Sequence, residues 1–241
     1  MAIRRNSAIK NYLKLIPGCL CAGIVALQIY FFIAIVLLRW FDPDSTAFMR
    51  NERWRLCGVH FFSCSVQHTW VAYPQISLAL KRAVIASEDS GFIDHDGFEF
   101  DALKKAWEKN LKRGKTVSGG STISQQLAKN LFLTGEKNYL RKIQEMVITA
   151  MLEAFLSKQR ILEIYLNSVE WGEGVFGVQA AAQHYFGTSA GALNAQQSAR
   201  LAAALPAPKC FDKRQYCTKV RIDFNQRSRL IGSRMYAVVI P

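Results

Sequence analysis

The rest of this chain is organised around the stretch GGSTISQQLAKN, which runs from Gly119 to Asn130. Its two glycines permit backbone angles that are closed to other residues, and they let a ligand approach the main chain. Thr122 and Gln125 are three residues apart, which is the spacing of a helix N-terminal capping box. The stretch therefore predicts a turn followed by the start of a helix.

This helix is predicted to have a buried face and a polar face. Apolar side chains recur every fourth residue from Ile123 to Leu131 and form the buried stripe. The polar side chains on another face are Gln126, Lys129 and Asn130. A glycine turn, a helix N-terminus and a lysine about two turns on can together hold a phosphate. The alternative is a capped surface helix, because the turn lacks the spacing of a phosphate-binding loop.

Length and charge limit the classes of protein to which the chain can belong. It has 241 residues, 50% of them hydrophobic, which suffices for one globular domain with a sizeable core plus an accessory segment. The formal net charge of +13 attracts polyanions such as anionic lipid, pyrophosphate or nucleic acid. The sequence holds no internal repeat or low-complexity tract, so a solenoid or a disordered chain is not expected.

An almost uninterrupted apolar run from Leu15 to Leu38 carries no charge and is long enough, as a helix, to cross a hydrocarbon core of about 30 Å. Basic residues without acidic ones precede it, whereas Asp42 and Asp44 follow it. We therefore expect a cytoplasmic basic tail over residues 1–14, a transmembrane helix over residues 15–38, and the rest of the chain outside. A cleaved signal peptide is the alternative, but its apolar region would be about 7–15 residues long.

The six cysteines follow the same division. Cys19 and Cys21 fall in the apolar run, where they act as small hydrophobes. The others lie on the side where disulfides are allowed, and we expect the local pairs Cys57–Cys64 and Cys210–Cys217. The sequence has no Cys-x-x-Cys or His-x-x-x-His spacing, so a zinc site is not expected.

A second polar stretch, from Glu88 to Gly97, contains four carboxylates, a histidine and two glycines, and it follows a helix predicted from Ile76 to Ser87. Such a stretch is too polar for a core, and we interpret it as the source of a catalytic acid or base. The alternatives are a solvated acidic turn or a calcium loop, whose required spacing the stretch misses.

Helical patterns follow, and no long alternating run marks a sheet. Residues 98–111 interleave basic and aromatic side chains, which fits a membrane surface or a nucleic-acid face. Further helices are predicted over residues 157–167, 178–185 and 195–205.

On a helix predicted after Lys137, Arg141 and Glu145 stand at positions i and i+4, with Lys142 beside them, and taken alone this spacing indicates an ordinary surface salt bridge. Its predicted buried stripe is Leu140, Ile143, Val147, Ala150 and Ala154.

Four boxes, in this order and spacing, resemble the motifs of the peptidoglycan glycosyltransferases. They are Glu88-Asp89-x-x-Phe92-x-x-His95-x-Gly97, the stretch Gly119 to Asn130, Arg141-Lys142-x-x-Glu145, and Ile161-Leu162-Glu163-x-Tyr165-Leu166-Asn167. The resemblance covers roughly residues 76 to 208 and implies a monofunctional biosynthetic peptidoglycan transglycosylase, of the domain type found in class A penicillin-binding proteins. No transpeptidase activity is expected. The chain departs from the pattern at Ser124, where threonine is usual, and at Lys137, where arginine is frequent.

The resemblance implies a mostly α fold. It predicts a lysozyme-like helical glycosyltransferase domain over residues 76–241, with a small membrane-associated jaw subdomain. One transmembrane helix and a juxtamembrane segment over residues 39–75 precede that domain. The expected location is the bacterial inner membrane, with a single pass, a cytoplasmic N-terminus and a periplasmic catalytic domain.

The implied reaction polymerises lipid II into β-1,4-linked glycan strands with inversion and release of undecaprenyl pyrophosphate. Glu88 is expected to be the general base and Glu145 to orient cations, or alternatively to hold a divalent ion such as Mg²⁺ or Mn²⁺. No cofactor is required and no metal ligand is assigned. Expected partners are lipid II, the growing glycan strand, the membrane and other cell-wall synthesis proteins, without nucleic acid. The expected substrate-binding residues are Asp89, Phe92, His95, Gly97, Ser121, Thr122, Gln125, Gln126, Lys129, Asn130, Lys137, Arg141 and Lys142.

Two alternatives from other classes stay open at this point. A muramidase or lytic transglycosylase would share a one-glutamate, lysozyme-like site and cleave glycan, but a membrane anchor beside a strip of cations favours synthesis. A membrane-tethered cationic binding protein explains the charge of +13 and leaves the ordered boxes around Glu88 and Glu145 unexplained.

The charge asymmetry around the apolar run makes a prediction about topology. A phosphatase fused after Pro241 should be active, because that enzyme works only outside the cytoplasm. A reporter that works only inside the cytoplasm should be silent at the same position, and the opposite pattern would contradict the N-in orientation.

Overall fold

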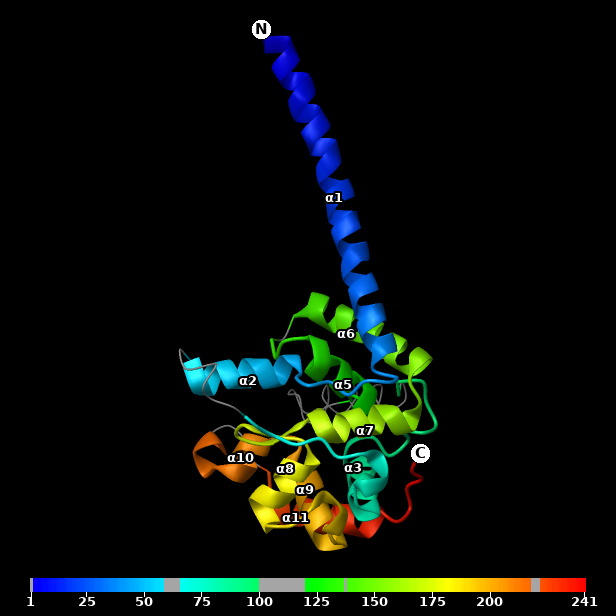
Figure 1. The fold of residues 1–241 in the computed structure, drawn as a ribbon, viewed down its shortest axis with the longest axis vertical. Coiled ribbons are helices and arrows are strands. Elements are labelled where there is room, and N and C mark those ends of the chain that lie inside the picture. The colour runs from blue at the N-terminus through cyan, green and yellow to red at the C-terminus, as the bar shows by residue number, and fades with distance from the viewer. Residues whose placement is uncertain (1, 59–65, 100–119, 137, 218–221) are drawn as a thin grey trace, which may run out of the picture. The chain divides into compact units, whose positions relative to one another are not determined.

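The computed structural model describes residues 2–58, 66–99, 120–136, 138–217 and 222–241 (Figure 1). The chain forms two compact units, Met1–Phe41 and Asp42–Pro241. The expected sites at Lys137 and Gly119, and residues 100–111 of the basic and aromatic segment, lie outside the described residues.

The first unit is a single long helix, α1, from Ala2 to Leu37. Within it, the 21 residues Pro17–Leu37 have a mean hydropathy of 2.6. At about 1.5 Å per residue, this segment is long enough to cross a bilayer. It agrees with the predicted apolar run and is compatible with a single-pass membrane anchor.

The second unit is mostly helical, which confirms the predicted fold class (Figure 1). Its helices are α2 (Ala47–Cys57), α3 (Leu78–Glu88), α5 (Ile123–Phe132), α6 (Tyr139–Phe155), α7 (Lys158–Ser168), α8 (Val178–Phe186), α9 (Ala195–Ala204), α10 (Pro208–Asp212) and α11 (Phe224–Arg234). Short 3-10 turns are η2 (Tyr73–Gln75), η3 (Ala190–Ala192) and η4 (Arg214–Cys217).

A small sheet has the strand order β1-β3-β2, with β1 (Gln67–His68) parallel to β3 (Val175–Phe176) and β2 (Glu170–Gly172) antiparallel to β3. The segment over residues 42–73, to which the sequence analysis gave no role, supplies β1 and α2.

The core forms around the stretch from which the sequence analysis started. Helix α5 packs against α6 and α7, while α3 packs against α9 and α11. Ile123 and Leu127 of α5 are fully buried, as the predicted stripe requires, and so is Tyr165 of α7. The side chain of Ser157 caps α7, as expected. Ser77 precedes α3, but its hydroxyl donates to the Leu193 carbonyl oxygen instead of capping the helix.

Helix α6 buries the face opposite to the predicted one. Leu140 is 81% exposed and Ile143 58% exposed, and the rest of the predicted buried stripe is exposed as well. The buried residues are Glu145, Ile148, Thr149 and Leu152. Both sets repeat at helical spacing, so periodicity could not decide which one faces the protein. The exposed apolar stripe is an amphipathic surface of the kind that lies in a membrane interface.

The disulfide predictions have two outcomes. Cys210 and Cys217 form a disulfide, which confirms that pair, and Cys19 and Cys21 are free. Cys57 is also disulfide-bonded, but its predicted partner Cys64 lies outside the described residues.

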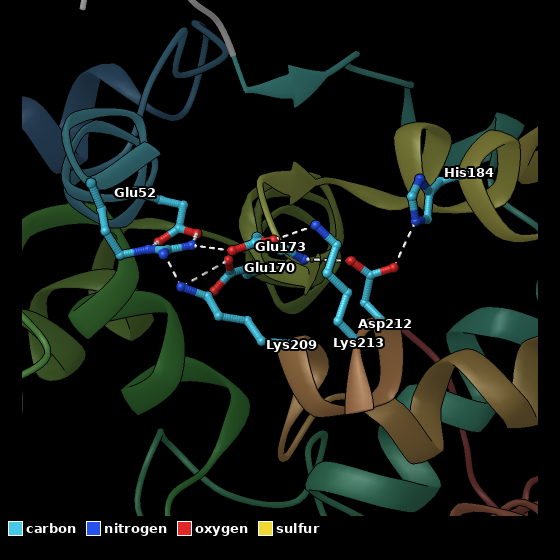
Figure 2. A network of polar contacts seen from close by, with 8 residues as sticks. Glu52, Glu170, Glu173, His184, Lys209, Asp212 and Lys213 are labelled. Carbon is cyan, nitrogen blue, oxygen red and sulfur yellow. Dashed lines mark hydrogen bonds and ion pairs between the residues drawn. The ribbon is translucent and has the colours of Figure 1, made fainter. Parts of the chain in front are cut away.

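A network of charged side chains ties α2 to the β2–β3 hairpin and to α10 (Figure 2). Arg55 Nη2 contacts Glu52 Oε1 at 2.6 Å and Glu173 Oε1 at 2.7 Å. Lys209 Nζ lies 2.6 Å from Glu52 Oε2 and 3.4 Å from Glu170 Oε1. The network thereby joins segments that are far apart in the sequence.

Glu170 has the longest of these ion pairs, at 3.4 Å. Its Oε1 atom is buried and has the ion pair with Lys209, but no hydrogen-bond donor among the described residues. Burial raises the pKa of the Glu170 carboxyl to about 7, which Lys209 partly counteracts and Glu52 reinforces. The folded protein therefore binds a proton at Glu170 more tightly than the unfolded chain does.

This raised pKa predicts a pH dependence of stability. The contribution of Glu170 is present below its unfolded pKa, near 4.5, and is lost as pH rises through about 7. It should be worth at most about 3 kcal/mol. Replacing Glu170→Gln keeps the shape without the ionisation, so the melting temperature of the solubilised chain should fall less between pH 5 and 8 than in the wild type. Exposed Glu136→Gln is the matched control, and parallel melting curves for wild type and Glu170→Gln would contradict the assignment.

Candidate functional site

The N-terminus of α5 has the predicted capping box. The backbone N–H of Gln125 donates to Thr122 Oγ1, and the backbone N–H of Thr122 donates to Gln125 Oε1, both at 3.2 Å. The Thr122 hydroxyl also donates to the Gly97 carbonyl oxygen at 2.7 Å. This last bond joins the two polar stretches that the sequence analysis singled out.

The acidic loop folds onto the same helix end. Asp89 is buried, and its Oδ2 accepts a hydrogen bond from the Ile123 backbone N–H at 3.0 Å. Its Oδ1 lies 2.8 Å from His95 Nε2. Because His95 Nδ1 accepts from the Gly97 N–H at 3.0 Å, Nε2 carries the hydrogen and donates to Asp89. A carboxylate at the start of α5 is also favoured by the helix dipole.

Gly97 allows this loop to meet α6. Its φ is +85°, and a Cβ atom there would lie 2.8 Å from side-chain carbons of both Thr149 and Glu153. Phe92 is fully buried, with Lys158 Nζ 4.7 Å from its ring centroid. Gly97 and Phe92 thus hold the acidic loop, residues 88–97, against α6 and α7.

Glu88 ends α3, and its carboxylate is held by three different elements. Oε1 accepts from the Ser87 hydroxyl at 2.9 Å and from Arg227 Nη2 at 3.2 Å. Oε2 accepts from Gln126 Nε2 at 3.1 Å. The side chain is 10% exposed and borders a cavity of about 150 Å³, whose wall includes Ser121 and Thr122.

A buried tyrosine holds Gln126 in place. The Tyr165 hydroxyl donates to Gln126 Oε1 at 3.1 Å, so the amide nitrogen is directed to Glu88. Burial raises the pKa of Tyr165 well above its ordinary value, and the nearby carboxylates of Glu88 and Asp89 add to that rise. Tyr165 therefore stays protonated and remains a donor.

The second carboxylate, Glu145, lies in a different environment. Its side chain is 4% exposed, with Oε2 2.7 Å from Arg141 Nη1 and Oε1 paired with Lys142 Nζ. The salt bridge between Arg141 and Glu145 that the spacing indicated is present, but it is buried and not on the surface, because α6 turns Glu145 inward. A buried carboxylate with two cationic partners fixes the positions of both cations more firmly than a surface pair does.

The pKa of Lys129 depends on both carboxylates. Burial lowers the pKa of its ammonium group, and the positive charges of Arg141 and Lys142 lower it further. The negative charges of Glu145 and, more weakly, of Glu88 oppose this lowering. A cavity of about 510 Å³ opens at Arg141 and Lys142, with Asn138 and Tyr139 also in its wall. Asn130 is buried, and Lys137 lies outside the described residues.

The residues around Glu145 do not fit a divalent ion. Both oxygens of Glu145 are already paired with cations, and Lys129 adds a third positive charge nearby. In the part of the chain that the structure describes, no group of three or more His, Cys, Asp or Glu residues could hold a metal. The chemistry that this arrangement offers is proton acceptance at Glu88 and stabilisation of an anion at the cations.

Three residues of the site escaped the sequence analysis. Ser87 stands beside Glu88 but was assigned only to a helix end, and Tyr165 stands in the last motif box, where it received no role. Arg227 lies outside all four boxes, and nothing local connects it with a residue 139 positions away.

Comparisons with known proteins identify the family to which this chain is similar. The sequence model of the family described as transglycosylase matches residues 59–236. A biosynthetic peptidoglycan transglycosylase of Cupriavidus metallidurans is 62% identical over 231 residues, covering 96% of this chain and 99% of that protein. Proteins with the same description from Ralstonia nicotianae and Burkholderia pseudomallei are 60% and 49% identical, over 96% and 98% of this chain and 99% and 91% of their own lengths.

The Thr122 hydroxyl predicts a stability effect that needs no ligand. Thr122→Val keeps the side-chain shape but leaves the Gln125 N–H and the Gly97 carbonyl oxygen without their partner, which should cost about 1–3 kcal/mol. For a domain of this size, each kcal/mol lowers the melting temperature by about 2–4 °C. Thr122→Ser keeps the hydroxyl and is the matched control. Equal melting temperatures for the two variants would show that the hydroxyl does not hold the site together.

Proposed function

Because the chain belongs to the transglycosylase family and is a peptidoglycan glycosyltransferase of cell-wall synthesis, we propose that it polymerises lipid II into β-1,4-linked glycan with inversion. The other product is undecaprenyl pyrophosphate. The observation that carries this proposal is the separation of the site into two parts. One carboxylate, Glu88, lies at a small cavity, while a distinct set of cations on α5 and α6 surrounds Glu145.

Glu88 acts as the general base in this proposal. The acceptor's 4-hydroxyl must lose a proton as its oxygen attacks the donor sugar, and a carboxylate can take that proton when it lies within hydrogen-bond reach. Ser87 and Arg227 on one oxygen, and Gln126 on the other, hold the carboxylate in one orientation. The cavity beside it offers the place for the hydroxyl.

The cations act on the leaving group. A departing pyrophosphate gains negative charge, so it needs positive charge nearby and no acid. Arg141 supplies the planar fork that suits a phosphate, and Lys142 and Lys129 supply point charges. Glu145 keeps Arg141 and Lys142 in place. Lys137 joins this set by its resemblance to the family motif.

The other expected binding residues divide by their contacts. Ser121 lines the cavity beside Glu88 and Gln126 donates to Glu88, so both are proposed to position the sugar. The remaining ones are proposed to act by holding the acidic loop and the start of α5 in place, and they are Asp89, Phe92, His95, Gly97, Thr122, Gln125 and the buried Asn130.

The proposed location is the inner membrane, with a cytoplasmic N-terminus and a periplasmic catalytic unit. The apolar span in α1 supports the anchor. The exposed apolar stripe of α6, beside Arg141 and Lys142, supports the membrane-associated jaw. Such a stripe fits lipid better than nucleic acid, which would require a charged face. The growing glycan strand and other cell-wall synthesis proteins are the proposed further partners.

The decisive experiment gives the purified full chain lipid II as its substrate. Glycan polymer should appear, lipid pyrophosphate should be released, and β-lactams should leave both unchanged. Isolated cell-wall sacculi, added instead of lipid II, should release no glycan fragments, whereas a muramidase or lytic transglycosylase would release them.

The two carboxylates should respond differently to removal of their charge. Glu88→Gln keeps the shape but cannot take a proton, so kcat should fall by about 10²–10⁴-fold with little change in lipid II binding. Glu145→Gln leaves Arg141 and Lys142 without their partner, so the KM for lipid II should rise more than kcat falls. Steady-state kinetics with fluorescent lipid II measures both. The control is Asp94→Asn, which changes an exposed carboxylate of the same loop, and unchanged pH–rate profiles for Glu88→Gln would remove Glu88 from the role of base.

A further inference from the structure

Helix α11 brings a guanidinium group to the carboxylate of Glu88. Arg227 Nη2 lies 2.8 Å from Ser87 Oγ and 3.2 Å from Glu88 Oε1. Helix α11 packs on α3 and α9, so its position relative to the end of α3 is set by helix packing. The Arg227 side chain is 34% exposed to solvent, whereas the Glu88 side chain with which it pairs is 10% exposed.

The two oxygens of Glu88 are not equivalent. Oε1 faces two donors: Arg227 Nη2, and the Ser87 hydroxyl, whose single hydrogen also has the Ala202 carbonyl oxygen as an acceptor 3.2 Å away. Oε2 accepts one, from the neutral amide of Gln126, in the part of the chain that the structure describes. A lone pair that already binds a cation is a poorer proton acceptor than a free one.

The other charged or titratable groups around Glu88 come from several elements. Asp89 and Glu99 share the cavity wall with it, and Asp89 is engaged by His95 and by the Ile123 N–H. Tyr165 of α7 donates to Gln126, and Lys129 of α5 interacts more strongly with Glu145 than with Glu88. Among the described residues, the cation that forms a direct ion pair with Glu88 is Arg227.

We propose that Arg227 is a positioning residue: by occupying Oε1 it fixes the Glu88 carboxylate and leaves Oε2 as the oxygen that takes the proton. This inference rests on the proposed function and specifies how its base is arranged. The O–H bond of the acceptor's 4-hydroxyl breaks and its proton goes to Oε2. The hydroxyl oxygen forms the new bond to the donor's anomeric carbon, and the bond from that carbon to the pyrophosphate breaks, with its electron pair leaving on the pyrophosphate.

Without Arg227, the Glu88 carboxylate should sample more orientations, and fewer of them should direct Oε2 to the acceptor's hydroxyl. The orientation of the base affects the chemical step more than the binding of lipid II, so kcat should fall more than the KM for lipid II changes.

The test uses the full chain and three variants of Arg227. In Arg227→Gln a hydrogen-bond donor remains without the charge, and in Arg227→Ala both are absent. In both variants kcat should fall by about tenfold, while the KM for lipid II changes much less. Arg227→Lys keeps the charge and should restore part of kcat. The matched control is Arg229→Ala, which changes an exposed arginine of the same helix and should leave both kinetic constants unchanged.

A second measurement reports on Glu88 without any turnover. Infrared difference spectra between wild type and Glu88→Gln, taken at one neutral pH in each Arg227 background, should show that the antisymmetric carboxylate stretching band of Glu88 shifts and broadens once Arg227 is replaced by Gln. An unchanged band overturns the inference. Equal changes in kcat and in the KM for lipid II, in variants with unchanged melting temperatures and an unchanged band, also overturn it and leave Arg227 a structural role. If the wild type makes no polymer from lipid II, the proposed function fails, while the spectra still decide the relation of Arg227 to Glu88.

Discussion

The hydrogen bonds at the N-terminus of α5 are the constraint on which the rest of the site depends. A helix start leaves backbone N–H groups without partners, and here Thr122 and Asp89 satisfy two of them. Because Asp89 directly follows Glu88, the bond from the Ile123 N–H to Asp89 also fixes where α3 ends relative to α5. Because the Thr122 hydroxyl reaches the Gly97 carbonyl, the whole acidic loop is held against the same helix end. The position of the proposed base is thus a consequence of capping.

The two acidic side chains of the site differ through their surroundings. Glu88 has partners from three elements and keeps a cavity at its side, so it can exchange a proton with a ligand. Glu145 is enclosed and bound to two cations of its own helix. A buried carboxylate without a cationic partner would be very unfavourable. The burial of Glu145 therefore requires its ion pairs with Arg141 and Lys142, and these ion pairs hold both cations in place. The same ion pairs hold Arg141 and Lys142 in the positions where the proposed function requires cations.

Helix α6 carries both the buried ion pairs of the site and an exposed apolar face. Its buried face carries Glu145, Ile148 and Leu152, while its exposed face is apolar from Tyr139 onward. In a water-soluble protein this orientation would be unfavourable, because a large apolar surface would face solvent. In a protein anchored by an apolar span of 21 residues, a lipid surface can stabilise it. The cations at the start of α6 then lie at the edge of an apolar surface, where a lipid-linked pyrophosphate would present its charges.

The sequence by itself determined the elements whose signals are local. The capping box at Thr122 and Gln125, the apolar span, the Cys210–Cys217 pair and the helices after Ser157 each depend on residues within a few positions of one another. The motif boxes also indicated the family, which the comparisons confirm, and they are the reason why Glu88 and Glu145 are proposed as the acidic residues of the site. Only the tertiary structure decided which face of α6 is buried, because two helical stripes compete there and burial depends on what packs against them. It alone brought Arg227 to Glu88, since helix packing, and no spacing in the sequence, places two residues 139 positions apart in contact.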